Sequence, residues 1–252
     1  MKPIVAAIGT THPLQVAGIG LDLRVADRLG IRVVTVVAGV SAQDARRVLA
    51  RSALDDALIA AQCSALHGLE IAAIHVGALL DAASANAVAS ALAGWPGAPV
   101  VCDPVIAASG GERLADDATV AALRTTLFPR CALITPNLAE AAALVGAPID
   151  DLAAMERAAR TLLQTGARAV LLKGGHLRGE AIDVLAQASG LTRFRAPRID
   201  ADLRGTGDLL AVAIAARLAF GDPIVDAIDA AREFVRSALR EGVEFAGMRT
   251  LP

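Results

Sequence analysis

The sequence predicts an α/β protein with a three-layer α/β/α fold, in which helices cover both faces of a mostly parallel central sheet. Short apolar runs alternate with longer segments of helical periodicity along most of the chain, the pattern of repeated strand–helix units with right-handed crossovers. The short runs are almost continuously apolar, as buried parallel strands are. No linker-like stretch, long charge run or fixed-period repeat divides residues 1–252, so we expect a single domain.

The elements follow in chain order. The expected strands are 3–8, 33–38, 72–76, 99–102, 131–135 and 169–173. Apolar residues at helical spacing place helices between them, near 17–29, 53–66, 82–93, 116–127 and 151–165. Two short segments, 181–186 and 191–196, joined by Ser189-Gly190, predict an antiparallel hairpin. Two long helices, 205–219 and 224–242, follow it.

The composition is that of a globular protein. The 252 residues are 55% hydrophobic and 20% charged, enough material for a large core. A net charge of -2 and a pI near 6.1 give no electrostatic reason to expect nucleic acid or an anionic membrane as partner. No apolar stretch reaches the ~18 residues of a membrane span, and the N-terminal apolar run is too short for a signal peptide. Cys63, Cys102 and Cys131 are odd in number and widely spaced, which is typical of buried thiols in a reduced, cytoplasmic protein.

Ligands of such folds bind beyond the carboxyl ends of the strands, so the residues after each strand are the candidates. Gly9 opens the turn GTTHPLQVAGIGLDL after the first strand, although its glycine spacing matches neither GxGxxG nor a Walker A loop. Asp22 falls in the helix that follows, where it is either a ligand or a solvated carboxylate. Gln43, in SAQD after the second strand, carries an amide that can pair with a heterocycle edge or belong to an ordinary loop.

Carboxylates and an amide follow two further strands. Asp103 comes directly after PVVC, and Asn137 and Glu140 follow CALIT in the sequence PNLAE. Magnesium takes few carboxylates together with water and substrate phosphate oxygens, and Asp103 with Glu140 can supply them. The alternative for Asn137 and Glu140 is a helix cap followed by an acidic first turn, which the spacing P-N-x-x-E also fits.

Lys173 stands at the end of the last parallel strand. Only two of the 24 basic residues are lysines, so the chain uses arginine almost wherever a cation serves. A compact ammonium at this place indicates a position that the arginine fork would not suit. The alternative is an ordinary lysine at a strand end.

The sequence GTGD begins the penultimate helix. Gly205 and Gly207 let backbone N–H groups approach an anion at the positive end of the helix, and the Thr206 hydroxyl adds a donor. Such a nest suits a phosphoryl group in transfer. Asp208 can accept the proton of an attacking hydroxyl, or it can simply stabilise the helix N-terminus. Taken with Asp103, Glu140 and Lys173, this predicts phosphoryl transfer from Mg-ATP.

These residues resemble the ribokinase-like superfamily and, within it, the hydroxymethylpyrimidine/phosphomethylpyrimidine kinases of thiamine biosynthesis. The resemblance spans nearly the whole chain and rests on AGIGLDL (17–23), the AQ of SAQD, VCDPVIAASGGERL (101–114), LITPNLAEAAAL (133–144), LLKGGH (171–176) and GTGD. The middle blocks, in this order and spacing, are its most specific part.

The resemblance implies an ATP-dependent kinase acting on 4-amino-5-hydroxymethyl-2-methylpyrimidine and on its monophosphate, with ATP and Mg²⁺ as cofactors and a homodimer as assembly. It implies that Asp208 is the base, that residues 205–207 form the anion hole, and that Lys173, Asn137 and Thr206 contact ATP phosphates. By the same resemblance Asp103 and Glu140 hold the metal, while Gly9, Asp22 and Gln43 bind the pyrimidine.

Several positions depart from the pattern of these kinases. They usually carry cysteine where Asp208 stands, whereas aspartate is usual in ribokinases and pyridoxal kinases. Arg204 replaces a histidine, and the first turn offers His12 and Gln15 among residues that replace a serine and paired glycines. Two other functions therefore remain open at this point: a pyridoxal or pyridoxine kinase of the same superfamily, and a catalytically reduced pyrimidine-binding sensor.

Overall fold

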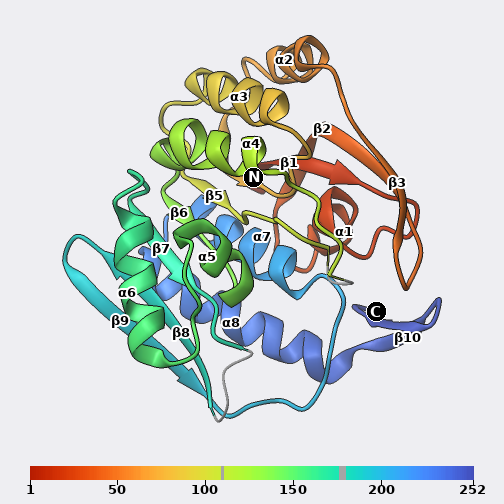
Figure 1. Cartoon of the computed structure of the whole chain (residues 1–252). Coiled ribbons are helices and arrows are strands. Elements are labelled where there is room, and N and C mark those ends of the chain that lie inside the picture. The colour runs from red at the N-terminus through yellow and green to blue at the C-terminus, as the bar shows by residue number, and fades with distance from the viewer. Residues whose placement is uncertain (109–110, 176–179) are drawn as a thin grey trace.

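Figure 1 shows the computed structural model of the chain, which describes residues 1–108, 111–175 and 180–252. Ser109 and His176, from the motifs in 101–114 and 171–176, lie outside these ranges. In the described part, strands form a nine-stranded sheet with the order β3-β2-β1-β4-β5-β6-β7-β8-β9. These strands are β1 Ile4–Thr11, β2 Arg32–Gln43, β3 Val48–Ala53, β4 Ile71–Val76, β5 Val100–Cys102, β6 Leu133–Ile134, β7 Ala169–Leu172, β8 Ala181–Gln187 and β9 Gly190–Ala196.

The middle of the sheet is parallel and its two edges are antiparallel. β1 pairs in parallel with both β2 and β4, and the parallel order continues through β5, β6 and β7. β3 pairs antiparallel with β2, and β8 and β9 form an antiparallel hairpin beside β7. The chain leaves β1 for β2 on one side and returns to β4 on the other. The space between β1 and β4 is therefore the switch point at which open α/β sheets bind ligands.

Helices cover both faces, as the sequence predicts. The helices are α1 Gly18–Val25, α2 Asp56–Ala65, α3 Ala82–Ala91, α4 Asp117–Ala122, α5 Leu138–Val145, α6 Leu152–Leu163, α7 Thr206–Ala219 and α8 Ile224–Glu241. One core cluster joins the sheet to α2, α3, α4, α5 and α6, a second joins it to α7 and α8, and a third packs α1 against α7 and α8. In Figure 1, α3, α4 and α5 lie in front of the sheet and α7 and α8 behind it.

α7 is the most deeply buried of these helices. Eight successive residues, Leu209–Ala216, are buried, which explains why its sequence is apolar on all sides rather than on one stripe. It packs against α8 and against β4, β5 and β1. Its N-terminus is thereby fixed at the carboxyl edge of the parallel strands.

Most of the expected elements are confirmed, with several differences, among them the strand β3, which was not expected. β2 runs on to Gln43, so the first three residues of SAQD lie within the strand rather than after it, because residues 39–43 pair with β3. The predicted helix 116–127 divides into α4 and a π-helical turn at Leu123–Leu127, which is followed by a 3-10 turn at Phe128–Arg130. A C-terminal hairpin of β10 Val243–Phe245 and β11 Met248–Thr250 was not expected.

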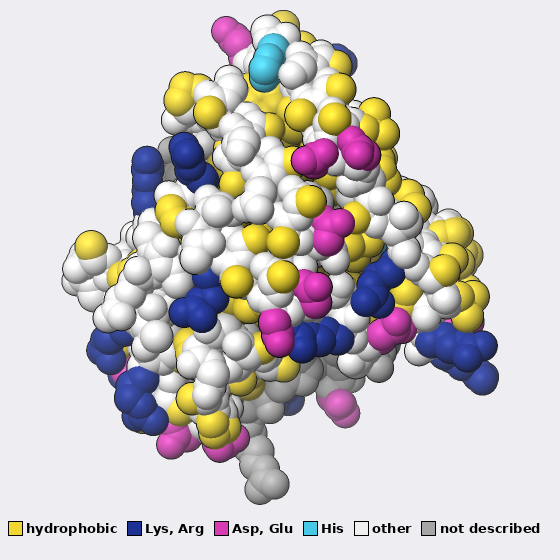
Figure 2. Space-filling view, turned by 45° about the horizontal axis from the view of Figure 1, so that its top comes forward, with side chains coloured by type: hydrophobic (Ala, Val, Ile, Leu, Met, Phe, Trp, Pro, Cys, Tyr) yellow, Lys and Arg dark blue, Asp and Glu magenta, His cyan; other side chains and the backbone are white. Residues whose placement is uncertain are grey.

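The surface carries charges of both signs. Figure 2 shows Lys and Arg side chains interspersed with Asp and Glu, and hydrophobic atoms between them, on the face it presents. This mixture fits the small net charge of -2. None of the helices in the described ranges is long and apolar enough to cross a membrane.

Candidate active site

Three neighbouring strands deliver polar side chains to one edge of the sheet. Asp103 follows β5, Asn137 follows β6 and Lys173 follows β7, and the register aligns these ends. Asn137 and Lys173 form a parallel bridge beyond the last regular pair of their strands. The structure therefore brings together residues that the sequence places after three strands of the sheet.

Lys173 and Asp103 form a buried ion pair. Lys173 Nζ lies 2.7 Å from Asp103 Oδ1, with the side chains 14% and 3% exposed. Thr135, at the end of β6, donates its hydroxyl to the same carboxylate oxygen at 3.1 Å. Burial opposes the charge of Lys173, but Asp103 and Glu140 outweigh it and raise the pKa of the ammonium. Lys173 is thus a fixed cation in the site.

Asn137 and Glu140 form a capping box at the start of α5. The backbone N–H of Glu140 donates to Asn137 Oδ1 at 2.9 Å, and that of Asn137 donates to Glu140 Oε2 at 2.8 Å. The helix-cap interpretation is confirmed. Glu140 also belongs to the charged cluster: burial raises the pKa of its carboxyl to about 7, Lys173 opposes this rise, and Asp103 adds to it. The two interpretations of Glu140 are therefore compatible.

The glycines of GTGD allow a close approach of backbone to this cluster. Gly205 caps α7 with φ +82, and a Cβ there would lie 2.4 Å from the Val16 carbonyl oxygen. A Cβ on Gly207 would lie 2.8 Å from Asp103 Oδ2 and 3.2 Å from Lys173 Nζ. The first N–H groups of a helix lack intrahelical partners. The positive end of α7 therefore lies directly beside the Lys173–Asp103 pair. An anion bound there can contact both the helix N–H groups and the Lys173 ammonium.

Asp208 lies in the first turn of α7, close to the end of β4. Its Oδ1 is 3.5 Å from the position that a Cβ would take on Gly77, just after β4. Burial raises the pKa of Asp208 to about 6, with a further rise from Asp103 and Asp22, while His75 and the Gly18 N–H oppose it. The carboxylate is ionised near pH 7 and has the pKa of a competent proton acceptor.

His75 was not singled out from the sequence and proves to be buried beside Asp22. Its Nδ1 lies 3.0 Å from Asp22 Oδ2, and the two side chains are 1% and 2% exposed. The remaining polar atoms, His75 Nε2 and Asp22 Oδ1, have no hydrogen-bond partner in the described part of the chain. The only signal in the sequence was a histidine within the apolar strand AAIHV.

The first turn is held by its own side chains. His12 Nε2 accepts the Ala17 N–H at 3.2 Å, and burial lowers the pKa of this imidazole. Gln15 adopts a positive φ of 53° and donates to Thr11 Oγ1 at 3.2 Å. A Cβ on Gly20 would collide with Gln15 Oε1, so the glutamine lies over the first turn of α1.

A cavity of about 1190 Å³ brings the predicted phosphate, metal and catalytic residues together. Its lining includes Asp103, Asn137, Glu140, Lys173, Gly205, Thr206, Gly207 and Asp208. It also includes Arg204 and Arg249, to which the sequence drew little or no attention. The predicted substrate residues do not line this cavity. Gly9 is buried next to Gly77 and Ala78, Asp22 pairs with His75, and Gln43 stands on the β2–β3 hairpin.

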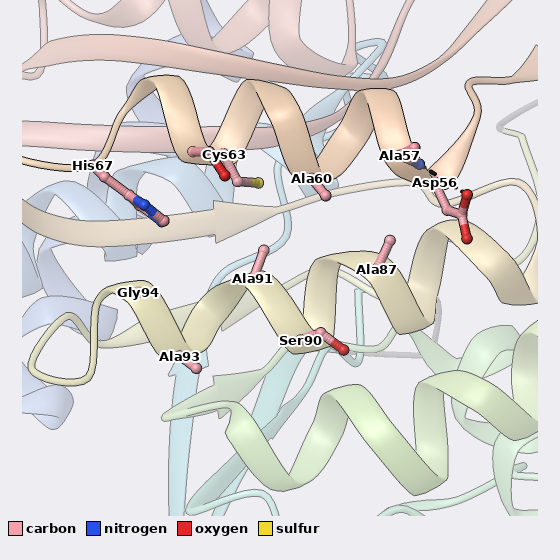
Figure 3. Close-up of a pocket in the computed structure, with 11 residues that line it drawn as sticks. Asp56, Ala57, Ala60, Cys63, His67, Ala87, Ser90, Ala91, Ala93 and Gly94 are labelled. Atoms are coloured by element: carbon pink, nitrogen blue, oxygen red, sulfur yellow. Dashed lines mark hydrogen bonds between the residues drawn. The ribbon is translucent and has the colours of Figure 1, made fainter.

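A second hollow lies on the surface between α2 and α3. It measures about 690 Å³ and is lined mostly by small side chains, with Cys63 and His67 among them. Figure 3 shows Ala60, Ala87 and Ala91 between the two helices, with His67 near one end and Asp56 near the other. None of the predicted site residues lines it.

The fold has well-matched relatives among solved structures. The crystal structure of phosphomethylpyrimidine kinase from Clostridium difficile is 27% identical, with a TM-score of 0.83 over 94% of this chain and 99% of that one. An ADP complex of Bacillus subtilis pyridoxal kinase is 26% identical, with a TM-score of 0.91 over 100% and 97%. The fold is ribokinase-like, and fold and site together define an ATP-dependent phosphotransferase for small molecules.

Sequence relatives narrow the class. Residues 15–251 match the phosphomethylpyrimidine kinase family. The hydroxymethylpyrimidine/phosphomethylpyrimidine kinases of Rhizobium meliloti and Escherichia coli are 38% and 37% identical, over 88% and 96% of this chain and 85% and 92% of theirs. The chain belongs to the phosphomethylpyrimidine kinase family. It is also 39% identical to a bifunctional thiamine biosynthesis protein of Geobacter sulfurreducens, of which it spans 46%.

Proposed function

We propose that this chain transfers the γ-phosphoryl group of ATP to the hydroxymethyl group of 4-amino-5-hydroxymethyl-2-methylpyrimidine and, in a second step, to the resulting monophosphate. The observation that carries the proposal is the contact of Gly207 with the Lys173–Asp103 pair, on the same helical turn as Asp208. This arrangement joins an anion hole, a cation and a base at one edge of a cavity.

Asp208 is the proton acceptor. As the alcohol oxygen forms its bond to the γ-phosphorus and the bond to the bridging oxygen of ADP breaks, the hydroxyl proton passes to the Asp208 carboxylate. The N–H groups of residues 205–207 and the Thr206 hydroxyl stabilise the charge on the equatorial oxygens. Lys173 and Asn137 contact the phosphates of ATP, and Lys173 is already held as a cation by Asp103.

Asp103 and Glu140 fit a magnesium ion bound largely through water and phosphate. One oxygen of Asp103 is used by Lys173 and Thr135, and the other faces Gly207 at the anion site. The described residues include no group of three or more His, Cys, Asp or Glu side chains arranged to hold a metal. Two carboxylates beside a phosphate site are what Mg²⁺ uses when it retains water ligands. When bound, the ion would neutralise charge on the phosphate oxygens.

Gly9, Asp22 and Gln43 form the proposed pyrimidine side. The free Oδ1 of Asp22 is a buried acceptor that suits an exocyclic amino group, and a buried acceptor without a partner is costly. Gln43 lies on the β2–β3 hairpin, and its amide would pair with the edge of the pyrimidine ring. The aspartate at position 208 and the likeness to a pyridoxal kinase make pyridoxal the second candidate substrate.

We also propose a cytoplasmic homodimer. The three buried free thiols, Cys63, Cys102 and Cys131, support a reducing compartment. The dimer rests on the resemblance to the pyrimidine kinases and is tested by light scattering of the purified chain.

ADP release with a panel of phosphoryl acceptors tests the function. The panel contains hydroxymethylpyrimidine, its monophosphate, pyridoxal and ribose, and mass spectrometry identifies each product. We expect a phosphorylated pyrimidine, with one ADP released for each phosphoryl group transferred. Preferred turnover of pyridoxal would overturn the proposal and identify the chain as a pyridoxal kinase. Turnover of none, with tight pyrimidine binding in calorimetry, would identify a sensor and overturn the proposal.

A further inference from the structure

His75 lies on the face of the sheet that carries the proposed base. Strand residues two apart point to the same face, and Ala73, two positions earlier on β4, belongs to the core cluster formed with α7 and α8. The neighbouring residues Ile74 and Val76 belong to the opposite cluster. His75 therefore projects toward α1 and α7, the helices that carry Asp22 and Asp208.

The His75–Asp22 pair is almost fully removed from water. A buried ion pair is expensive, and apolar residues of similar size are often as stable or more stable. Within the described ranges each partner also leaves one polar atom without a hydrogen bond, which adds to the cost. Such a pair at the switch point between β1 and β4 is better explained by a role in the site than by stability alone.

Gly77 brings His75 close to the base. A Cβ at Gly77 would lie 3.5 Å from Asp208 Oδ1 and 4.0 Å from His75 Cε1. The imidazole and the carboxylate thus approach the same point just beyond β4, and the absent side chain leaves the space between them clear. Because both groups are buried and close together, a charge on the His75 imidazole would interact strongly with the Asp208 carboxylate.

In the described part of the chain, three carboxylates act on His75. Asp22 faces it from α1, Asp208 from α7 and Asp103 from the end of β5. Burial alone lowers the pKa of the imidazole, but these three carboxylates outweigh it and raise the pKa to about 9. These carboxylates favour an imidazolium at neutral pH, which together with Lys173 would offset part of the negative charge of the site.

We propose that His75, held by Asp22, is a positioning residue that presents a positive charge to Asp208 and keeps the base carboxylate ionised and ready to accept a proton. The inference rests on the proposed function in so far as Asp208 is the base. The electrostatic coupling between His75 and Asp208 does not depend on which alcohol is phosphorylated.

The resting charge of His75 is tested in the wild-type protein by long-range ¹H–¹⁵N correlation of imidazole nitrogens. The His75 signals are assigned by their loss in His75→Gln. We expect both ring nitrogens to be protonated at pH 7.5. A neutral ring at this pH would overturn the proposal, whatever the activity of the enzyme.

The coupling is tested by titrating the Asp208 carboxyl carbon, labelled with ¹³C, in wild type and in two variants. His75→Gln keeps an amide for Asp22 but removes the charge, so we expect the Asp208 midpoint to rise by about one unit. His75→Lys keeps a charge, so we expect its midpoint to stay near that of the wild type. Equal midpoints in wild type and folded His75→Gln would overturn the proposal.

Kinetics give the functional readout. In His75→Gln we expect the acidic limb of kcat/KM for the alcohol to move up with the Asp208 midpoint, so that activity lost at pH 6.5 returns toward pH 9. The KM for ATP should not change, and His67→Gln, at an exposed histidine between α2 and α3, should behave as wild type. A uniform loss at all pH values would indicate a structural role and overturn the proposal. If the wild type phosphorylates no alcohol, the proposed function fails, while the two NMR tests still decide the coupling.

Discussion

Gly207 lies directly against Asp103, with room for no side chain between them. A Cβ at Gly207 would be 2.8 Å from Asp103 Oδ2 and 3.2 Å from Lys173 Nζ. The φ of Gly207 is ordinary for a helix, in contrast to that of Gly205. The glycine is therefore required by its neighbours and not by its backbone conformation. This contact places the positive end of α7 beside the ion pair that ends β5 and β7.

Gly207→Ala tests whether the site needs the space beside Gly207 and not a special backbone conformation. Alanine favours the helix, so we expect a folded protein, but Asp103 or Lys173 must move. We expect kcat/KM to fall about 10²-fold, the scale of a damaged anion hole. Steady-state kinetics measure it, and Gly97→Ala, at an exposed glycine with open space around it, is the control. Wild-type rates in Gly207→Ala would show that phosphate does not bind here.

Glu140→Gln distinguishes the cap from the metal ligand. Glutamine can still accept the Asn137 N–H, so the capping box survives. Because burial holds the pKa of Glu140 near 7, ionising it costs folding free energy as pH rises from about 4.5 to about 7. At pH 8 we therefore expect Glu140→Gln to be at least as stable as wild type in urea.

The magnesium dependence of the same variant gives the second readout. We expect the Mg²⁺ concentration for half-maximal activity to rise about tenfold, on the order of the loss of one ligand. An unchanged magnesium dependence would leave Glu140 with the capping role alone.

The stability of the fold should depend on pH through His75. Its pKa is raised in the folded state, from 6.5 to about 9, so its stabilising contribution is fully present below pH 6.5 and is lost as pH rises through 9. We expect the stability advantage of wild type over His75→Gln to shrink across this interval, by about 3 kcal/mol at most. Urea denaturation at four pH values measures the difference. An advantage that grows with pH would contradict the charged state of His75.

The sequence predicted the parts of the site that follow from strand ends. Asp103, Asn137 and Lys173 come directly after apolar runs, and parallel strands bring such residues to one edge. GTGD was recognisable because glycines at a helix start have a specific physical use. Contacts between side chains that lie far apart in the chain gave no such signal.

His75 and β3 show what could not be predicted. Asp22 and His75 are 53 positions apart, and they meet because α1 packs on β1, which pairs with β4. β3 consists mostly of exposed residues, so it lacks the apolar run that identifies a buried strand. Its pairing with β2 extended that strand to Gln43 and moved the predicted loop residue into the hairpin.

Turnover of Asp208→Asn, measured with hydroxymethylpyrimidine and ATP, tests the central claim most directly. The amide preserves shape but cannot accept the proton, so we predict a loss of kcat of about 10²–10⁴-fold, with ATP affinity unchanged in calorimetry. The variant must retain the unfolding midpoint of the wild type for the comparison to hold. Near wild-type turnover in folded Asp208→Asn would contradict the assignment of Asp208 as the base.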